Sequence, residues 1–279
     1  MKYFKMLGLC LVVVFALSAV VVSAAQAEET RGPLWIVGSH GTPLAAGETR
    51  AITSRNEGVY RLRATGPTVV ECKETINAGF LLGGEPGTDY TQITFKQCSL
   101  EANAGCVATG LRPLKPANNG EAIVDALTAL AYALGTRESA VDVFAPESEG
   151  NLFVEFELTG AACGKLEKAK IEVLANGTEI TIKSEKRKCG AIAEVGHTVA
   201  GAFVLSKPGE VAKVGLLNLP QEVIKSAEYL ETIEGKSSLR KIECGLETKG
   251  GIAGKAAEVG TSIVEISKPT AGEEFGWDH

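Results

Sequence analysis

The chain has 279 residues, and its 34 acidic residues outnumber its 28 basic ones, which gives a net charge of −6. An acidic chain lacks the clustered lysine and arginine that attract nucleic acids and anionic lipid surfaces, so no nucleic-acid partner is expected. The length accommodates one large β domain or two smaller ones.

Residues 1–27 have the features of a secretory signal peptide. Two lysines precede the apolar run Leu7–Val22, and Ala25-Gln26-Ala27 offers a cleavage site before Glu28. A membrane anchor is the alternative, but it needs roughly 20 apolar residues followed by a stop-transfer pattern. We therefore expect a chain that contacts the membrane only through its signal peptide and is secreted, to the medium or the cell wall. Removal of the leader would leave 26 basic and 34 acidic residues, which gives a net charge of −8.

Cysteine usage agrees with export. Of the seven cysteines, Cys10 lies in the leader, and six remain. An even number in an oxidising compartment predicts three disulfides. The sequence does not choose among the pairings, and our working hypothesis joins nearest neighbours: Cys72–Cys98, Cys106–Cys163 and Cys189–Cys244. A metal site is not expected, because there is no C-x-x-C and no histidine at ligand spacing from a cysteine.

Residues 33–65 predict a β-meander, with a turn at Asn56-Glu57-Gly58. In the strand expected at Val59–Thr65, Tyr60, Leu62 and Ala64 share one face, while polar or charged residues occupy the other. This alternation indicates that the Tyr60 face is buried.

The segment Ala122–Leu134 is ambiguous. Ile123, Leu127 and Leu130 have helical spacing, and Gly135 is suited to a helix C-cap. The alternative is a buried strand that turns after Gly135. In contrast, Asn151–Thr159 alternates between apolar and charged residues and predicts a half-buried strand.

Asn176-Gly177 predicts a β-hairpin, because both positions of a type I′ turn favour these residues. A two-residue loop would pair Val173 with Ile180 and Ile171 with Ile182, which places the large aliphatic side chains on one face.

The division into domains is open. Residues 28–184 are expected to form a β-rich domain, and residues 185–279 either a second β-rich module or a continuation of the first. The tail Thr270–His279 is polar apart from Trp277 and is expected to be frayed.

No catalytic, cofactor-binding or metal-binding residue is predicted. His40 and His197 are interpreted as exposed turn residues, and no nucleophile motif accompanies them. Gly250–Lys255 resembles a phosphate loop but lacks its outer glycine and its hydroxyl residue. Glu155 and Glu157 lie about 7 Å apart on one strand face, as in a glycosidase pair, but a solvated sheet face is favoured. A compact calcium loop is not expected, because the aspartates are few: Asp89, Asp125, Asp142 and Asp278.

Several stretches carry a resemblance to known proteins: Pro33–Gly38, Leu44–Thr49, Thr68–Cys72, Phe95–Cys98 and Gly150–Leu158, followed by Cys163. Through them the region Arg31–Ser184 resembles a group of uncharacterised exported β-rich proteins of actinobacteria. The resemblance implies a β-rich exported fold and a strand, rather than a helix, at Ala122–Leu134. It implies no site residue, since none of these motifs is chemically specific.

These features predict a mainly β, antiparallel fold that is cross-linked by disulfides and is either a β-sandwich or a partly open barrel. The expected function is non-enzymatic binding of a surface ligand or another protein outside the cell or in the cell envelope, without a cofactor. Two alternatives stay open. One is a secreted hydrolase whose glutamates come from separate strands, and the other is a structural cell-wall protein.

Overall fold

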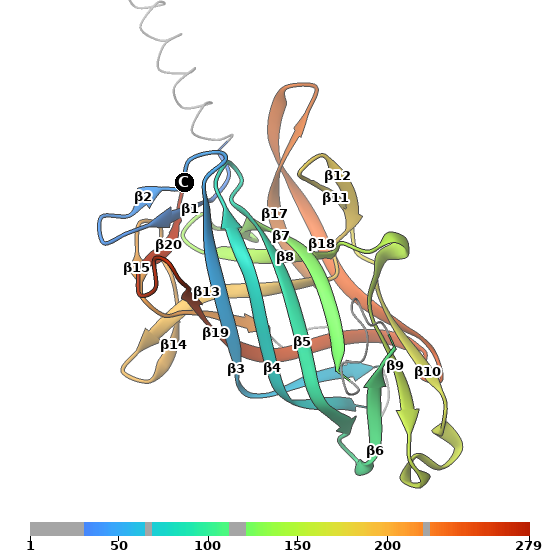
Figure 1. Cartoon of the computed structure of the whole chain (residues 1–279). Helices are drawn as coiled ribbons and strands as arrows, with labels where there is room; N and C mark the ends of the chain where they lie inside the picture. The colour runs from blue at the N-terminus through green and yellow to red at the C-terminus, as the bar shows by residue number, and fades with distance from the viewer. Residues whose placement is uncertain (1–30, 65–68, 112–120, 220–223) are drawn as a thin grey trace, which may run out of the picture.

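The computed structural model describes residues 31–64, 69–111, 121–219 and 224–279. These residues form a mainly β, antiparallel fold, so the predicted fold class is confirmed (Figure 1). No helix among them has the length and apolarity that crossing a bilayer requires. The expected signal peptide, residues 1–27, lies outside the described residues.

Four long strands form the common part of the large sheet. They are β3 (Thr49–Ala64), β4 (Val69–Leu82), β5 (Thr88–Leu100) and β19 (Gly254–Ile266). They pair antiparallel in the order β19-β3-β4-β5, and Figure 1 shows β3, β4 and β5 side by side. Since β19 comes from the last part of the chain, one sheet joins strands from both sides of residue 185.

At one end, the long strands close into a ring that we name ring A. Its other members are β7 (Ala122–Ala133), β8 (Ala140–Pro146), β13 (Ala191–Val199) and β16 (Gly215–Leu219). β7 pairs with β5 and β8, β13 pairs with β8 and β16, and β16 returns to β19. The pairing of β8 with β13 therefore closes ring A.

At the other end, the same strands close into ring B. Its other members are β6 (Asn103–Gly110), β9 (Leu152–Thr159), β10 (Lys170–Ala175) and β18 (Lys236–Gly250). They connect β5 to β19 through the pairings β5–β6, β6–β9, β9–β10, β10–β18 and β18–β19. β5 pairs with β7 up to Phe95 and with β6 from Ser99, so the two rings follow one another along the shared strands.

Smaller elements cover the rings. A four-stranded sheet contains β1 (Leu34–Val37), β2 (Thr42–Pro43), β15 (Val211–Ala212) and β20 (Phe275–Asp278). The remaining strands are β11 (Glu179–Ile182), β12 (Glu185–Lys188), β14 (Ala202–Leu205) and β17 (Ile224–Ile233). Two short 3-10 helices, η1 (Glu149–Asn151) and η2 (Ala161–Leu166), flank β9.

The turn predicted at Asn56-Glu57-Gly58 is wrong, because β3 continues through these residues as a bulge. The Asn56 side chain donates from Nδ2 to the Lys73 carbonyl oxygen at 2.9 Å and accepts from the Thr75 amide at 2.8 Å. It thus satisfies backbone groups of β4 where the register shifts. Polar residues followed by glycine suit a bulge as well as a turn, and the sequence did not separate the two.

The buried side chains form three clusters. One fills ring B around Phe95, Phe156 and Ile171. A second fills ring A and extends to Trp277 in the four-stranded sheet. The third lies on the opposite face of β7 and β8, under β11 and the β17–β18 hairpin, and includes Ile180.

The strand that the resemblance implied at 122–134 is β7, which is buried on both faces. Val124 and Leu130 face the interior of the rings, whereas Leu127 and Ala129 belong to the cluster outside them. A strand buried on both faces is apolar throughout, so its residues also match helical spacing. The periodicity was ambiguous for this reason.

The hairpin predicted at Asn176-Gly177 is wrong. β10 pairs with β9 on one side and β18 on the other, so it has no edge for β11, which pairs with β12 instead. The Gly177 amide donates to the Cys189 carbonyl oxygen at 3.0 Å, and the chain crosses to another layer there. Ile171 and Ile180 are both buried, as predicted, but in different clusters. Long-range pairing has overridden the local turn preference.

The expectation of a frayed tail is also wrong. β20 pairs along its whole length with β1, and the Trp277 side chain is fully buried. Its Nε1 donates to the Ser206 carbonyl oxygen at 3.2 Å, and its ring meets the Tyr132 ring edge-on at 6.3 Å. The polar tail is ordered because a single large apolar side chain closes the end of ring A.

The six cysteines form three disulfides, the same pairs as in the nearest-neighbour hypothesis: Cys72–Cys98, Cys106–Cys163 and Cys189–Cys244. The first joins directly opposite residues of β4 and β5. All six are buried. Three disulfides are typical of proteins that fold in an oxidising environment.

Replacing Trp277 by alanine is expected to lower the free energy of unfolding by about 3–5 kcal/mol, because it removes a fully buried indole and leaves a cavity. Urea unfolding measures the change. As the control, His279→Ala alters an exposed residue of the same tail and is expected to change stability by at most about 0.5 kcal/mol. Equal stability of the two variants would show that the tail does not close ring A.

Candidate functional site

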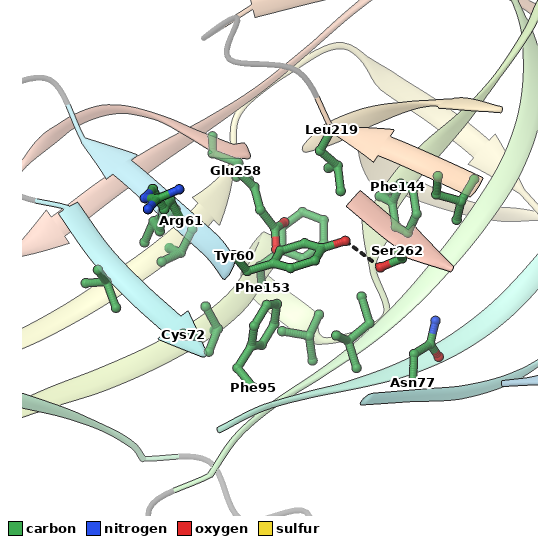
Figure 2. A pocket seen from close by; sticks show the side chains of 18 of the residues that line it. Tyr60, Arg61, Cys72, Asn77, Phe95, Phe144, Phe153, Leu219, Glu258 and Ser262 are labelled. Carbon is green, nitrogen blue, oxygen red and sulfur yellow. Dashed lines mark hydrogen bonds between the residues drawn. The ribbon is translucent and has the colours of Figure 1, made fainter. Parts of the chain in front are cut away.

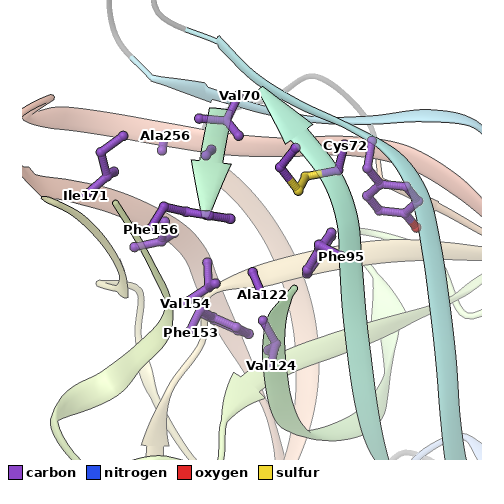
Figure 3. Packing of buried hydrophobic residues seen from close by; sticks show 14 of the residues in the cluster. Val70, Cys72, Phe95, Ala122, Val124, Phe153, Val154, Phe156, Ile171 and Ala256 are labelled. Atoms are coloured by element: carbon purple, nitrogen blue, oxygen red, sulfur yellow. A yellow bond between two sulfur atoms is a disulfide. The ribbon is translucent and has the colours of Figure 1, made fainter. Parts of the chain in front are cut away.

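A cavity lies inside the sheet where ring A passes into ring B (Figure 2). The space available to the centres of water molecules is about 60 Å³, enough for on the order of five waters. We name it the junction cavity. Most of its wall is apolar and includes Phe95, Val124, Phe144, Phe153, Val154, Phe156, Val173, Leu219 and Leu246. Figure 3 shows part of the buried cluster around Phe95 and Phe156, which includes wall residues of the cavity, beside the Cys72–Cys98 disulfide.

The bulge in β3 creates the polar side of this cavity. Three residues of β3, 58–60, lie opposite the single residue Gly260 of β19. This mismatch brings the Tyr60 ring over the backbone of β19, where a Cβ on Gly260 would lie 2.8 Å from it. Glycine is therefore required at position 260 for the ring to occupy this place.

Tyr60 and Ser262 form a buried hydrogen-bonded pair, with 2.5 Å between their hydroxyl oxygens (Figure 2). The Tyr60 ring also meets the Phe95 ring edge-on, at 6.0 Å between centroids. Burial raises the pKa of Tyr60 well above its usual value, and the charge of Glu258 raises it further, while the Ser262 hydrogen bond opposes the rise. Tyr60 is therefore protonated at neutral pH and is a weaker acid than an exposed tyrosine.

Glu258 also belongs to the cavity wall, and its charge acts on Tyr60. It lies on β19 two residues after the buried Ala256 and faces the interior beside Tyr60 (Figure 2). Part of its surface is exposed, but its carboxyl group is surrounded by the wall, and this burial raises its pKa to about 7. At neutral pH it exists in both forms, so it can donate or accept a hydrogen bond.

The remaining polar wall residues are neutral or engaged elsewhere. Asn77 accepts a hydrogen bond from the Thr91 hydroxyl through its Oδ1. Arg61 borders the cavity, but its guanidinium pairs with Glu71 at 2.9 Å and Glu101 at 3.0 Å. Among the described wall residues there is no imidazole or ammonium group to activate Ser262. The arrangement suits binding of a molecule with an apolar body and one polar end.

The glutamates considered from the sequence lie elsewhere. Glu155 and Glu157 are half-buried on the outer face of β9, opposite Glu172 and Lys170 of β10. Gly250–Lys255 includes the last residue of β18, the turn that follows it and the first two residues of β19. None of these residues lines the junction cavity.

The histidines lie elsewhere too. His40 is exposed, as expected. The expectation for His197 is wrong, because it lies within β13, is half-buried, and has its Nδ1 3.3 Å from Ser206 Oγ. β13 extends past His197 because it pairs there with both β14 and β16.

Sequence reasoning found the buried face of Tyr60 but not the site. Alternation along β19 places Glu258 and Ser262 on one face, but only the bulge of β3 brings Tyr60 between them. The available signal is a charged residue on the apolar face of β19, which otherwise carries Ala256, Val264 and Ile266. Comparison with known proteins adds no neighbour, because no family model, curated protein or solved structure matches the chain.

Stability is expected to fall between pH 5 and pH 8, in part through Glu258. Its folded-state pKa of about 7 exceeds its usual value of 4.5, so the folded protein binds this proton more tightly. The resulting stabilisation is complete below the usual pKa and is lost as the pH rises through 7. Urea midpoints at both pH values measure the loss, which Glu258→Gln is expected to reduce.

Glu265→Gln is the matched control, because Glu265 lies on the same strand outside the cavity wall. This variant is expected to keep the wild-type pH dependence. An unchanged pH dependence in Glu258→Gln would contradict the placement of that carboxyl group.

Proposed function

We propose that the protein is a non-enzymatic binding protein that holds a small, mostly apolar molecule with one hydroxyl group in the junction cavity. The observation that carries the proposal is the Tyr60–Ser262 pair beside Glu258 in an otherwise apolar wall. Ligand sites in proteins commonly combine apolar walls with a few convergent polar groups. The size of the cavity limits the ligand to about one ring or a short alkyl chain.

The polar groups can accommodate a ligand hydroxyl without losing their own bond. Each hydroxyl of the Tyr60–Ser262 pair has one donor and two acceptor positions, and the bond between them uses only part of this capacity. Glu258 adds a group that donates when protonated and accepts when ionised. The site therefore favours ligands that both donate and accept, such as phenols and short alcohols.

The hydrolase alternative has less support. Ser262 bonds to Tyr60, whose raised pKa keeps it protonated, so Tyr60 cannot serve as the base that takes the serine proton. Glu258 is the one carboxyl group among the described wall residues. A glycosidase needs two such groups on opposite sides of the scissile bond.

We further propose that binding takes place outside the cytoplasm, in the medium or the cell wall. The three disulfides and the leader pattern of residues 1–27 support this location. Expression in a bacterial secretion host is expected to yield a protein whose first residue, by N-terminal sequencing, is Glu28. An exported protein that still begins at Met1 would contradict cleavage of the leader.

Binding is expected to prefer a phenol over the same ring without the hydroxyl. The ¹⁹F NMR signals of 4-fluorophenol and fluorobenzene, titrated with the protein, give the two dissociation constants. A hydrogen bond to the Tyr60–Ser262 pair is worth about 1 kcal/mol, so 4-fluorophenol is expected to bind about five- to tenfold more tightly. Ser262→Ala is expected to reduce this preference while leaving fluorobenzene binding unchanged.

A matched pair of substitutions tests the location. Val154→Phe fills the cavity and is expected to abolish binding of both probes. Val107→Phe makes the same change at an exposed position of β6 and is expected to leave binding intact. No binding by the wild type at millimolar probe, or equal loss in both variants, would overturn the proposal.

A further inference from the structure

A second polar group lies deeper in ring A, away from the junction cavity. Asp89 of β5 and Asp142 of β8 both line a cavity near the four-stranded sheet, and their exposed fractions are 4% and 0%. Thr128 of β7, the strand between them, lies directly opposite Asp89 and is 0% exposed. Three adjacent strands thus direct two carboxyl groups and a hydroxyl into the interior.

Four oxygen atoms of these groups have no hydrogen-bond partner in the described part of the chain, although the Thr128 hydroxyl lies close enough to the Asp142 carboxyl group to oppose the rise of its pKa. The unpartnered atoms are Asp89 Oδ1, both carboxyl oxygens of Asp142 and Thr128 Oγ1. Buried polar atoms in folded proteins nearly always have a partner, because an unsatisfied group retains its full desolvation cost. Four such oxygens on neighbouring strands point to a ligand that would bind them.

The charge of the two carboxyl groups indicates what kind of ligand they would bind. Burial raises the pKa of both carboxyl groups, and the charge of Asp142 raises that of Asp89 further, while Lys183 opposes this. Lys183 is exposed in the turn between β11 and β12, so it does not neutralise the pair inside the ring. A divalent cation would neutralise both carboxylates at once.

The cavity beside Asp89 and Asp142 has room for the water molecules that would complete the coordination of a cation. The cavity offers about 30 Å³ to the centres of water molecules, room for about two waters. With the four protein oxygens, two waters reach the lower end of the six to eight oxygen ligands that Ca²⁺ takes. No group of three or more His, Cys, Asp or Glu side chains suited to a metal occurs among the described residues, so neutral oxygens would complete the shell.

We propose that Asp89, Asp142 and Thr128 bind one oxygen-seeking divalent cation of the Ca²⁺ type inside ring A. The site lies on three rigid strands and not in a compact calcium loop. Its occupant would connect β5, β7 and β8 and stabilise the part of ring A nearest Trp35, which lines the same cavity.

Trp35 makes the proposal directly testable, because an excited indole transfers energy to Tb³⁺, a luminescent substitute for Ca²⁺, at short range. Titration of the protein with Tb³⁺ is expected to give sensitised emission that saturates at one ion per chain and is displaced by Ca²⁺. Asp142→Asn and Asp89→Asn are expected to abolish this emission. Asp125→Asn, on the outer face of β7, is the control and is expected to retain it.

Thr128→Val removes one neutral ligand without changing charge and is expected to weaken Tb³⁺ binding about tenfold, which provides a readout if the aspartate variants fail to fold. Ca²⁺ is also expected to raise the thermal midpoint of the wild type but not of Asp142→Asn. The proposal is overturned if the wild type shows no sensitised emission, or if its midpoint depends on pH and not on Ca²⁺. The latter result would mean that protons, shared between the two carboxyl groups, take the place of the cation.

Discussion

The mismatch between β3 and β19, three residues opposite one, is the constraint on which the interior depends. It allows the shared strands to continue from ring A into ring B while their register changes. It also brings Tyr60 inward over Gly260, where Ser262 and Glu258 can contact it. The junction cavity therefore lies where the strands change register, and not in a loop. A bulge placed beside a site commonly redirects a side chain in this way.

The interior contains polar groups of two kinds. Tyr60 and Ser262 satisfy each other, so they cost little in the empty protein and can still accept a further partner. Asp89, Asp142 and Thr128 together leave four buried oxygens without a hydrogen-bond partner in the described part of the chain. This difference distinguishes the proposed site for a neutral ligand from the proposed site for a cation. The two proposals therefore concern separate cavities and separate experiments.

Local patterning predicted much of the fold and little of the site. Alternation identified the buried face of Tyr60 and the strand around Phe156, because each has one polar face. Alternation did not identify β7 as a strand, because β7 is buried on both faces. At Asn176-Gly177 the predicted pairing of β10 with β11 does not form, because β10 pairs with β18 and β11 pairs with β12. Asp89 and Asp142 are 53 positions apart in the sequence, and only the pairing of β7 with both β5 and β8 brings them into one cavity.

The position of β19 late in the chain has a consequence for biosynthesis. Both rings need residues 254–266 to close. β1 cannot pair with β20 until residues 275–278 have been synthesised. Contacts between such distant segments slow folding, because the connecting chain must be ordered first. A polypeptide that is synthesised from its N-terminus therefore cannot complete either ring until residues 254–266 are available for pairing. Until these segments pair, both rings stay open and the edges of their strands lack partners.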